Sequence, residues 1–268
     1  MATPRTFAAT FDDGARTPSR LSQYTLGVAA HLLLLLAWYL FVRFGDVPKF
    51  VMPSPADTLK ALLVPDYGWW ANGLVTATEI FGGYAMALVV GVLLALAFTW
   101  SKTLESMMLP LLVTLNMIPK VALGPLIIVW FKYGVFPNSM MAFAIAVFPI
   151  LLTTARGLRE IEPDLLDLVR SLRGSRWQLF TKIQLPGALP YVFAGMKVAA
   201  ILAVAGAIVG EFLGSDRGLG YLMLQVQVTL DTPAMFMAVI LITLIGMSLY
   251  GLVLLLEHLL VVKDARVS

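Results

Sequence analysis

The sequence predicts an all-α, polytopic membrane protein with six transmembrane helices. Hydrophobic residues form 59% of the 268-residue chain, charged residues form only 13%, and the mean hydropathy is +0.86. Soluble domains have about 45–50% apolar and about 25% charged residues. The charges are also unevenly distributed, because four stretches carry none: residues 21–42, 80–101, 133–155 and 232–256. Each stretch is long enough for one helix to cross about 30 Å of hydrocarbon.

Two more hydrophobic regions are long enough to span the membrane, although each contains one lysine, Lys120 or Lys197. The predicted transmembrane domain therefore covers residues 21–262, between a polar tail at 1–20 and a short tail at 263–268. Its first segment is too long for a cleavable signal peptide and lacks a small-residue cleavage site. The six predicted spans are 21–43, 79–101, 106–131, 133–155, 188–210 and 232–257, and a long polar loop covers 156–187.

The distribution of Lys and Arg predicts the orientation of these spans. With both termini in the cytoplasm, twelve basic residues lie inside and five lie outside, in accord with the positive-inside rule. The net charge of +3 is explained by this inner-face excess, so it gives no reason to expect nucleic acid. Half of the inner basic residues belong to the long loop: Arg156, Arg159, Arg170, Arg173, Arg176 and Lys182.

Between the first two spans, residues 54–63 have the pattern of a short surface helix on the outer side. Ser54 is a suitable N-cap, Pro55 suits the first helical position, and Asp57 falls in the first turn. We expect its apolar face to lie flat on the outer leaflet; that face consists of Leu59, Leu62 and Leu63.

The long loop contains the most informative segment. A helix is predicted over 163–173, because apolar residues recur every three or four positions, Pro163 can begin it and Gly174 can end it. An amphipathic helix at the cytoplasmic face must place its apolar side on the lipid headgroups or in a groove of a soluble partner. The apolar positions are Leu165, Leu168, Val169 and Leu172.

This loop resembles the cytoplasmic EAA loop of ABC importer permeases, which reads Glu-Ala-Ala, three residues, Gly, nine residues, Ile-x-Leu-Pro. With Ile183, Leu185 and Pro186 as anchors, Asp167-Leu168-Val169 stands at Glu-Ala-Ala and Arg173 at the Gly, while Gly174 lies one place late. Further segments resemble the nitrate/sulfonate/taurine branch of that family: Met52-Pro53-Ser54-Pro55, Ile118-Pro119-Lys120, the run from Pro125 to Phe131, Val209-Gly210-Glu211-Phe212-Leu213-Gly214 and Gly218-Leu219-Gly220-Tyr221.

The resemblance implies a type I ABC importer permease fold in the bacterial inner (plasma) membrane. It also implies a second copy of this chain, two ATPase subunits that bind ATP and Mg, and an external solute-binding protein, with no cofactor in this chain. ATPase-driven motion would pass through a stiff Leu185-Pro186 into the fifth span, while Trp177 and Phe180 pack the second helix of the loop. The expected coupling residues are Leu165, Asp167, Leu168, Arg170, Leu172, Arg173, Gly174, Trp177, Ile183, Leu185 and Pro186.

The residues themselves suggest no catalytic or metal site. His31 and His258 stand in different spans, the chain has no cysteine, and no P-loop, His-Glu-x-x-His or Gly-x-Ser-x-Gly pattern occurs. We therefore expect a non-enzymatic transport subunit. Glu79, Glu211 and Glu257 fall near predicted span ends and are interpreted as interfacial, and Lys197 is expected to extend to the cytoplasmic interface.

A transport path is suggested at two places. Lys120 follows Pro119 inside a span, one turn after Asn116, so it either satisfies carbonyls freed by the proline or forms a polar spot on the path. Gly206, Gly210 and Gly214 share one helix face, which either packs within the chain or lines the path or the contact between two copies. The predicted path residues are Asn116, Pro119, Lys120, Gly206, Gly210 and Glu211.

The residues leave the solute open. The resemblance suggests a sulfonate such as taurine, a nitrate-like anion, or a nitrogen heterocycle such as a thiamine precursor. The alternative function is a self-contained secondary transporter or a membrane scaffold. Secondary transporters usually have internal repeats and buried coupling residues, and the sequence shows neither.

Overall fold

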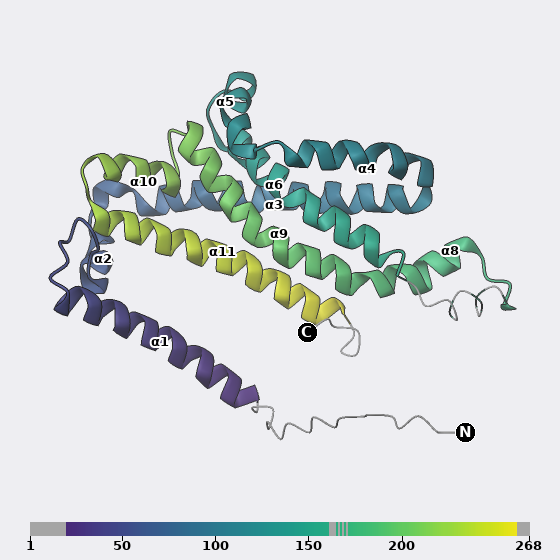
Figure 1. Cartoon of the computed structure of the whole chain (residues 1–268), viewed down its shortest axis with the longest axis horizontal. Helices are drawn as coiled ribbons and strands as arrows, with labels where there is room; N and C mark the ends of the chain where they lie inside the picture. The colour runs from purple at the N-terminus through teal and green to yellow at the C-terminus, as the bar shows by residue number, and fades with distance from the viewer. Residues whose placement is uncertain (1–19, 161–164, 166, 168, 170, 262–268) are drawn as a thin grey trace, which may run out of the picture. The chain divides into compact units, whose positions relative to one another are not determined.

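The structure, a computed structural model, describes residues 20–160, 165, 167, 169 and 171–261. It divides into two units, Met1–Pro48 and Lys49–Ser268. The predicted tails at 1–20 and 263–268 lie outside the described residues except for Arg20. The described part of the first unit is one long helix, α1 (Arg20–Phe44), followed by a short turn (Figure 1). Leu32, Leu33 and Leu36 are more than half exposed, as expected of a helix that faces lipid.

The regular elements in the described part of the second unit are all helices, joined by turns and loops (Figure 1). It begins with two short elements, α2 (Pro55–Ala61) and η1 (Pro65–Tyr67). Its longer helices are α3 (Trp69–Trp100), α4 (Lys102–Met117), α5 (Lys120–Phe131), α6 (Val135–Gly157), α9 (Leu185–Gly214) and α11 (Thr232–Leu260). Its shorter elements include α8 (Arg176–Leu179), the π-helical turn η2 (Phe180–Gln184) and α10 (Leu219–Val228).

The core of this unit lies where α3, α6 and α9 pack together. Its buried positions are rich in alanine, including Ala87, Ala142 and Ala203, each 0% exposed. Small side chains let helix backbones approach closely, and this contact replaces the hydrophobic driving force that lipid removes. Gly83 shows how close the approach is, since a Cβ atom there would lie 2.5 Å from the Cβ atom of Ala142.

Long helices overlap the predicted spans, with differences at their boundaries. Within the described residues, five helices are long and apolar enough to cross a membrane, and a bent pair would make a sixth. The second span begins at Trp69 rather than near residue 79, which places Glu79 inside the helix. The region 106–131, predicted as one span, is instead two helices, α4 and α5, that meet at 87°. Pro119 at the junction has no N–H with which to continue α4.

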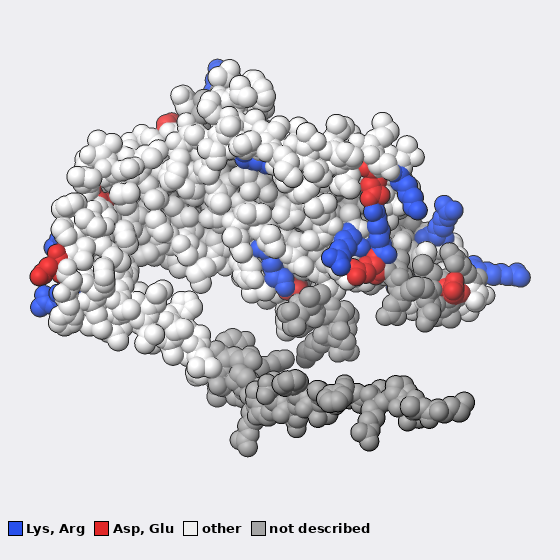
Figure 2. All heavy atoms as spheres, viewed as in Figure 1, with Lys and Arg blue, Asp and Glu red and all other residues white. Residues whose placement is uncertain are grey.

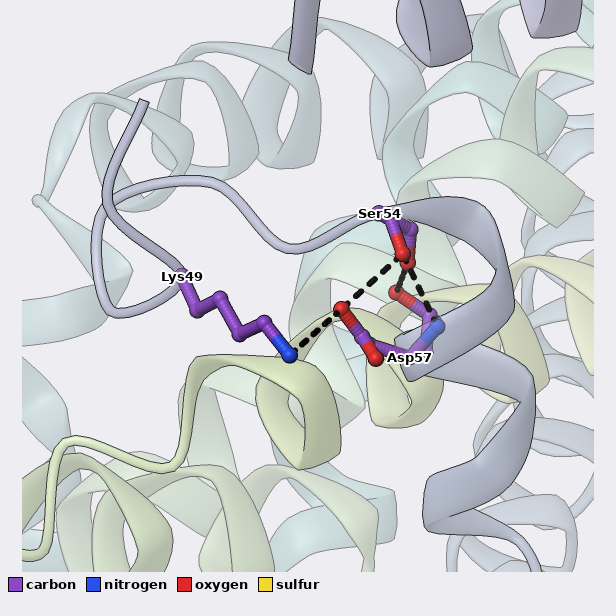
Figure 3. A network of polar contacts seen from close by, with 4 residues as sticks. Lys49, Ser54 and Asp57 are labelled. Atoms are coloured by element: carbon purple, nitrogen blue, oxygen red, sulfur yellow. Dashed lines mark hydrogen bonds and ion pairs between the residues drawn. The ribbon is translucent and has the colours of Figure 1, made fainter. Parts of the chain in front are cut away.

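The surface helix predicted at 54–63 is present as α2. The hydroxyl of Ser54 accepts a hydrogen bond from the Asp57 backbone N–H at 3.1 Å and donates one to Asp57 Oδ2 at 3.0 Å. Lys49 Nζ lies 3.4 Å from the same oxygen (Figure 3). The Ser54 hydrogen bond, with Lys49 adding to it, lowers the pKa of the Asp57 carboxyl. The predicted apolar face is exposed, with Leu59, Leu62 and Leu63 at 60%, 42% and 80%.

Candidate functional site

Basic side chains gather at the end of the second unit that carries α8 (Figure 2). They come from the ends of α4, α6 and the loop, and include Arg156, Arg159, Arg176 and Lys182. Arg159 forms an ion pair with Glu105 at the start of α4, and Arg156 Nε lies 3.1 Å from Glu160. Hydrogen bonds from Tyr191 and Arg156 lower the pKa of the exposed Glu160 carboxyl. This end is the one that the sequence assigns to the cytoplasm.

The predicted coupling helix lies in this end, and its described positions 165, 167, 169 and 171 are helical. Leu168 and Arg170 lie outside the described residues. Leu165 is 37% exposed and Leu172 is 73% exposed, so the helix presents apolar surface that its own chain leaves uncovered. An apolar face of this kind is suited to a groove in another protein.

The turn that ends this helix differs from the prediction. Arg173, not Gly174, has the left-handed conformation, with φ of 52°. The backbone N–H of Gly174 donates to the carbonyl of Val169 at 2.8 Å, the six-to-one hydrogen bond of a Schellman motif. Arg173 therefore occupies the position where the EAA pattern has Gly, and it adopts the conformation that glycine favours. The expectation that Gly174 supplies this turn is wrong.

Gly174 has a different reason to be small. A Cβ atom there would lie 2.6 Å from Val169 Cγ1 and 3.2 Å from the Val169 carbonyl oxygen. The chain then begins α8 with a reciprocal capping box between Ser175 and Gln178. The turn is thus closed on both sides by local hydrogen bonds.

The second half of the loop continues directly into α9. The stiff Leu185-Pro186 expected between the loop and the fifth span does not end the preceding helix, because η2 joins α8 to α9 without a break. In η2 the backbone N–H of Leu185 donates to the carbonyl of Phe180. This wider π turn shifts the register of the hydrogen bonds before Pro186, which has no N–H to donate. Motion of α8 can therefore pass into α9 as motion of one helix.

Trp177 and Phe180 behave differently from each other. Phe180 is 9% exposed and packs against Trp100 at the end of α3, with ring centroids 5.7 Å apart. Trp177 was expected to pack as well, but it is 65% exposed, with its ring centroid 5.8 Å from that of Phe180. Ile183 is partly buried, whereas Leu185 and Pro186 are exposed.

The bend between α4 and α5 contains the first group of predicted path residues. Lys120 Nζ donates to the backbone carbonyl of Asn116 at 2.5 Å and to Asn116 Oδ1 at 2.8 Å. Of the two open interpretations, this is the one in which the lysine satisfies groups freed by Pro119. These hydrogen bonds do not test whether Asn116, Pro119 and Lys120 line the transport path, so that role stays a prediction.

A second polar cluster joins α3, α6, α9 and the start of α10. Its centre is a pair of carboxyl groups, Glu79 and Glu211, which are 0% and 1% exposed and lie within hydrogen-bonding reach of each other. Asn138 Nδ2 donates to Glu79 Oε1 at 2.8 Å, and Thr76 Oγ1 donates to Glu211 Oε1 at 2.6 Å. Both carboxyl groups therefore face neighbouring helices rather than the surface of the chain, and their depth in the membrane stays a prediction.

Glu211 caps α10 from outside that helix. The N-cap residue Gly218 has no side chain with which to cap, so the first N–H groups of α10 need other acceptors. Gly220 and Tyr221 donate to Glu211 Oε2, Leu219 donates to Thr76 Oγ1 at 2.8 Å, and Gly218 donates to Asn72 Oδ1 at 2.9 Å.

The glycines of the 218–221 segment follow from this cap. Gly218 has φ of 110°, and a Cβ atom there would lie 2.3 Å from the Glu211 carboxyl carbon. A Cβ atom on Gly220 would lie 2.9 Å from Glu211 Oε2. The carboxyl group occupies the space that these side chains would need.

The small-residue face of α9 packs against α6 within the chain. A Cβ atom on Gly206 would lie 2.6 Å from the Ala142 Cα atom, and one on Gly210 would lie 2.9 Å from the Asn138 Cα atom. Gly206, Gly210 and Glu211 therefore face neighbouring helices of the same chain, and a place on the transport path stays a prediction for these three residues. The close approach at Gly210 brings Asn138 to Glu79. The sequence could have pointed to this contact only through the presence of acidic residues in apolar stretches.

A third polar contact joins α9 to α11. Lys197 Nζ lies 3.0 Å from Glu257 Oε1, and the two side chains are 22% and 9% exposed. Lys197 was expected to extend to the interface and Glu257 to be interfacial, yet the two neutralise each other between helices. No cluster of three or more His, Cys, Asp or Glu suited to a metal ion occurs within the described residues.

Comparison with known proteins supports the resemblance to ABC importer permeases that the helices and the loop indicate. Residues 87–261 match the family described as the binding-protein-dependent transport system inner membrane component. The chain belongs to this family. The ABC importer permease resemblance is thereby confirmed, and with it a multi-pass location in the inner membrane.

Two relatives and one solved structure illustrate the similarity. The riboflavin transport system permease RibX of Chloroflexus aurantiacus is 35% identical over 93% of this chain and 94% of its own. The formylaminopyrimidine transport permease ThiX of Halalkalibacterium halodurans is 30% identical over 85% and 92%. A chain of the MetNI methionine ABC transporter, solved in inward-facing conformations, aligns with a TM-score of 0.50 over 72% of this chain and 95% of its own, at 22% identity. This last similarity supports the permease fold alone.

Proposed function

We propose that two copies of this permease form the passage for a small solute, coupled to two separate ATPase subunits and supplied by an external binding protein. The termini and the 156–187 loop are cytoplasmic in this proposal. ATP and Mg bind to the ATPase subunits, and this chain contributes no catalytic group. The family supports a role as permease subunit of an ABC importer, and the partners are proposed from that role.

The uncovered apolar surface of the loop is the observation that carries the coupling. Leu172 and Trp177 are 73% and 65% exposed at an end of the molecule that is rich in Arg and Lys. Apolar side chains among charged residues gain free energy when a partner groove removes them from water. Asp167 and the neighbouring arginines can then set the orientation of the docked helix.

The path of the motion follows from the continuity of α8, η2 and α9. When the ATPase pair closes, the docked loop moves, and α9 moves with it because the helix does not break at Pro186. Phe180 against Trp100 and Arg159 with Glu105 connect the same end to α3 and α4. The loop therefore acts on several helices of the bundle at once.

For the solute, we propose an aromatic nitrogen heterocycle. The relatives named for riboflavin and for formylaminopyrimidine transport, both at least 30% identical, carry such compounds by their names. Sulfonates and nitrate-like anions have less support, because no basic side chain of the described core lacks an acidic or carbonyl partner: Lys120 binds Asn116 and Lys197 binds Glu257.

The proposal is tested by reconstituting the permease with its ATPase and binding protein in liposomes. We expect uptake of a pyrimidine or flavin that requires ATP and the binding protein, and that exceeds uptake of taurine or nitrate. Uptake driven by an ion gradient without ATPase would instead establish a secondary transporter. Preferred uptake of taurine would contradict the solute class while leaving the coupling intact.

A further inference from the structure

The Glu79 and Glu211 pair presents an electrostatic problem that the transport role does not explain. Both carboxyl groups are buried beside each other, at 0% and 1% exposure. Within the described residues, neither forms an ion pair with Lys or Arg; the nearest polar groups are hydroxyl, amide and backbone N–H donors. Glu79 Oε2 is fully buried and accepts no hydrogen bond from any of these donors.

Two charged carboxylates cannot share such a site without compensation. Burial disfavours each charge, and the neighbouring negative charge disfavours the second one further. In known carboxyl pairs of this kind, one proton is held between the two groups, because one neutral acid can donate a hydrogen bond to the other carboxylate. A proton on the pair would also provide the missing hydrogen bond at Glu79 Oε2.

The surroundings distinguish the two groups. Glu211 accepts three hydrogen bonds, from Thr76, Gly220 and Tyr221. Two of those donors belong to the first turn of α10, a helix end that favours negative charge. Glu79 accepts one hydrogen bond, from Asn138. The carboxylate charge is therefore best stabilised on Glu211, and the proton on Glu79.

We propose that Glu79 is a neutral carboxylic acid whose Oε2–H donates to the charged Glu211, and that this proton positions the start of α10. The hydrogen bonds then run from Asn138 on α6 through Glu79 on α3 to Glu211 on α9, and from Glu211 to α10. Four helices are joined by one chain of contacts at the end opposite the coupling loop. Glu79 acts as a positioning residue in this arrangement.

The hydrogen bonds that link Asn138, Glu79, Glu211 and the start of α10, here called the clamp, have a consequence for transport because of where they lie. Open pockets of about 390 Å³ at the loop end and 240 and 440 Å³ at this end indent the surface, and Glu79 lines the 240 Å³ pocket while Glu211 lines the 440 Å³ pocket. Tyr133 and Ser215 line both of the pockets at this end. The clamp therefore positions residues that line both pockets at this end. A role of these pockets in transport rests on the proposed function; the shared proton does not.

Infrared spectroscopy of the purified full-length permease tests the proton directly. We expect the carbonyl stretch of a protonated carboxylic acid in the unmodified chain at neutral pH, and its loss in Glu79→Gln. Glu79→Gln should otherwise behave as the unmodified chain, because an amide can donate to Glu211 and accept from Asn138. Its Tm in detergent should lie close to that of the unmodified chain, whereas Glu79→Leu and Glu211→Gln should each lower Tm by several degrees.

Three results would overturn the proposal: no acid band in the unmodified chain, an acid band unchanged in Glu79→Gln, or a loss of Tm in Glu79→Gln equal to that in Glu79→Leu. An absent band together with a Tm that rises with sodium concentration would show that a cation, not a proton, occupies the pair. Transport by Glu79→Gln should match that of the unmodified chain. If the unmodified chain itself does not transport, the function fails while the infrared result still decides the proton.

Discussion

Lys197 and Glu257 form an ion pair between α9 and α11, with 3.0 Å between Nζ and Oε1. Both helices are predicted spans, and both side chains are largely buried. Each residue by itself is costly inside a membrane protein, and the pair removes most of that cost. Since α9 continues from the coupling loop, this contact also joins α11 to the helix that the loop leads into.

The first prediction concerns this pair. Glu257→Gln should reduce stability by up to about 3 kcal/mol, because it leaves a mostly buried lysine without its partner. The charge-reversed double variant Lys197→Glu/Glu257→Lys should recover part of the loss. Thermal unfolding in detergent measures both. The exposed pair Arg156–Glu160 (side chains 73% and 48% exposed) is the control, and Arg156→Gln should change stability little. Equal effects of the two single variants would argue against a buried pair.

The second prediction concerns the turn after the coupling helix. Arg173→Gly should stabilise this turn by about 1 kcal/mol, because glycine adopts a φ of 52° without the cost that a side chain incurs. Gly174→Val should impair transport, since its Cβ atom would clash with Val169. Hydrogen exchange of the Gly174 amide, which bonds to Val169, measures the turn directly. Faster exchange in Arg173→Gly would show that the left-handed residue is not position 173.

The third prediction concerns docking to the ATPase. Leu172→Asp should insert normally into the membrane but lose co-purification with the ATPase and lose transport. An aliphatic contact contributes roughly 1.5–3 kcal/mol, and a charge placed against an apolar groove costs more than that. Leu168→Asp should have the same effect if Leu168 belongs to the same face.

The matched control for docking is Leu63→Asp. Leu63 is 80% exposed at the other end of the unit, just after α2, and is expected at the lipid headgroups. This variant should retain the ATPase. Full co-purification and transport in Leu172→Asp would contradict the docking proposal and favour a helix that lies on the lipid headgroups.

The fourth prediction concerns the contact of α9 with α6. Gly206→Ala should destabilise the protein by about 1–3 kcal/mol, because its Cβ atom would meet backbone atoms of Met141 and Ala142 at 2.9 and 2.6 Å. Gly251→Ala is the control, since no atom lies within 4 Å of its Cβ position; alanine there should stabilise α11 by about 0.5–1 kcal/mol. A comparison of Tm separates the two, and similar shifts would contradict the close approach of α9 and α6.

The fifth prediction concerns orientation. The chain has no cysteine, so Ser171→Cys and Ser215→Cys each introduce a single thiol. In intact cells a membrane-impermeant thiol reagent should label Ser215→Cys only, and both variants should react after permeabilisation. Labelling of Ser171→Cys in intact cells would reverse the orientation inferred from Lys and Arg.

Much of the candidate coupling loop could be predicted from local pattern. The spacing of Leu165, Leu168 and Leu172 indicates an amphipathic helix, and the Ile183-x-Leu185-Pro186 sequence sets its register within the family pattern. Two backbone details could not be predicted in the same way. Whether Arg173 or Gly174 takes the left-handed conformation depends on which amide reaches Val169, and Pro186 is compatible with either a break or a π turn.

The sequence by itself determined the class of protein, the long apolar helices and the basic loop, because hydrophobicity and charge act within each segment and are read from consecutive residues. Only the tertiary structure decided which polar residues meet. Thr76 and Glu211 are 135 positions apart, and Lys197 and Glu257 are 60 apart. Their meeting depends on how closely α3, α6, α9 and α11 pack. The same packing buries Glu79 and Glu211, which were assigned to the membrane interface, as a pair, because glycines on α9 allow the helix backbones to approach.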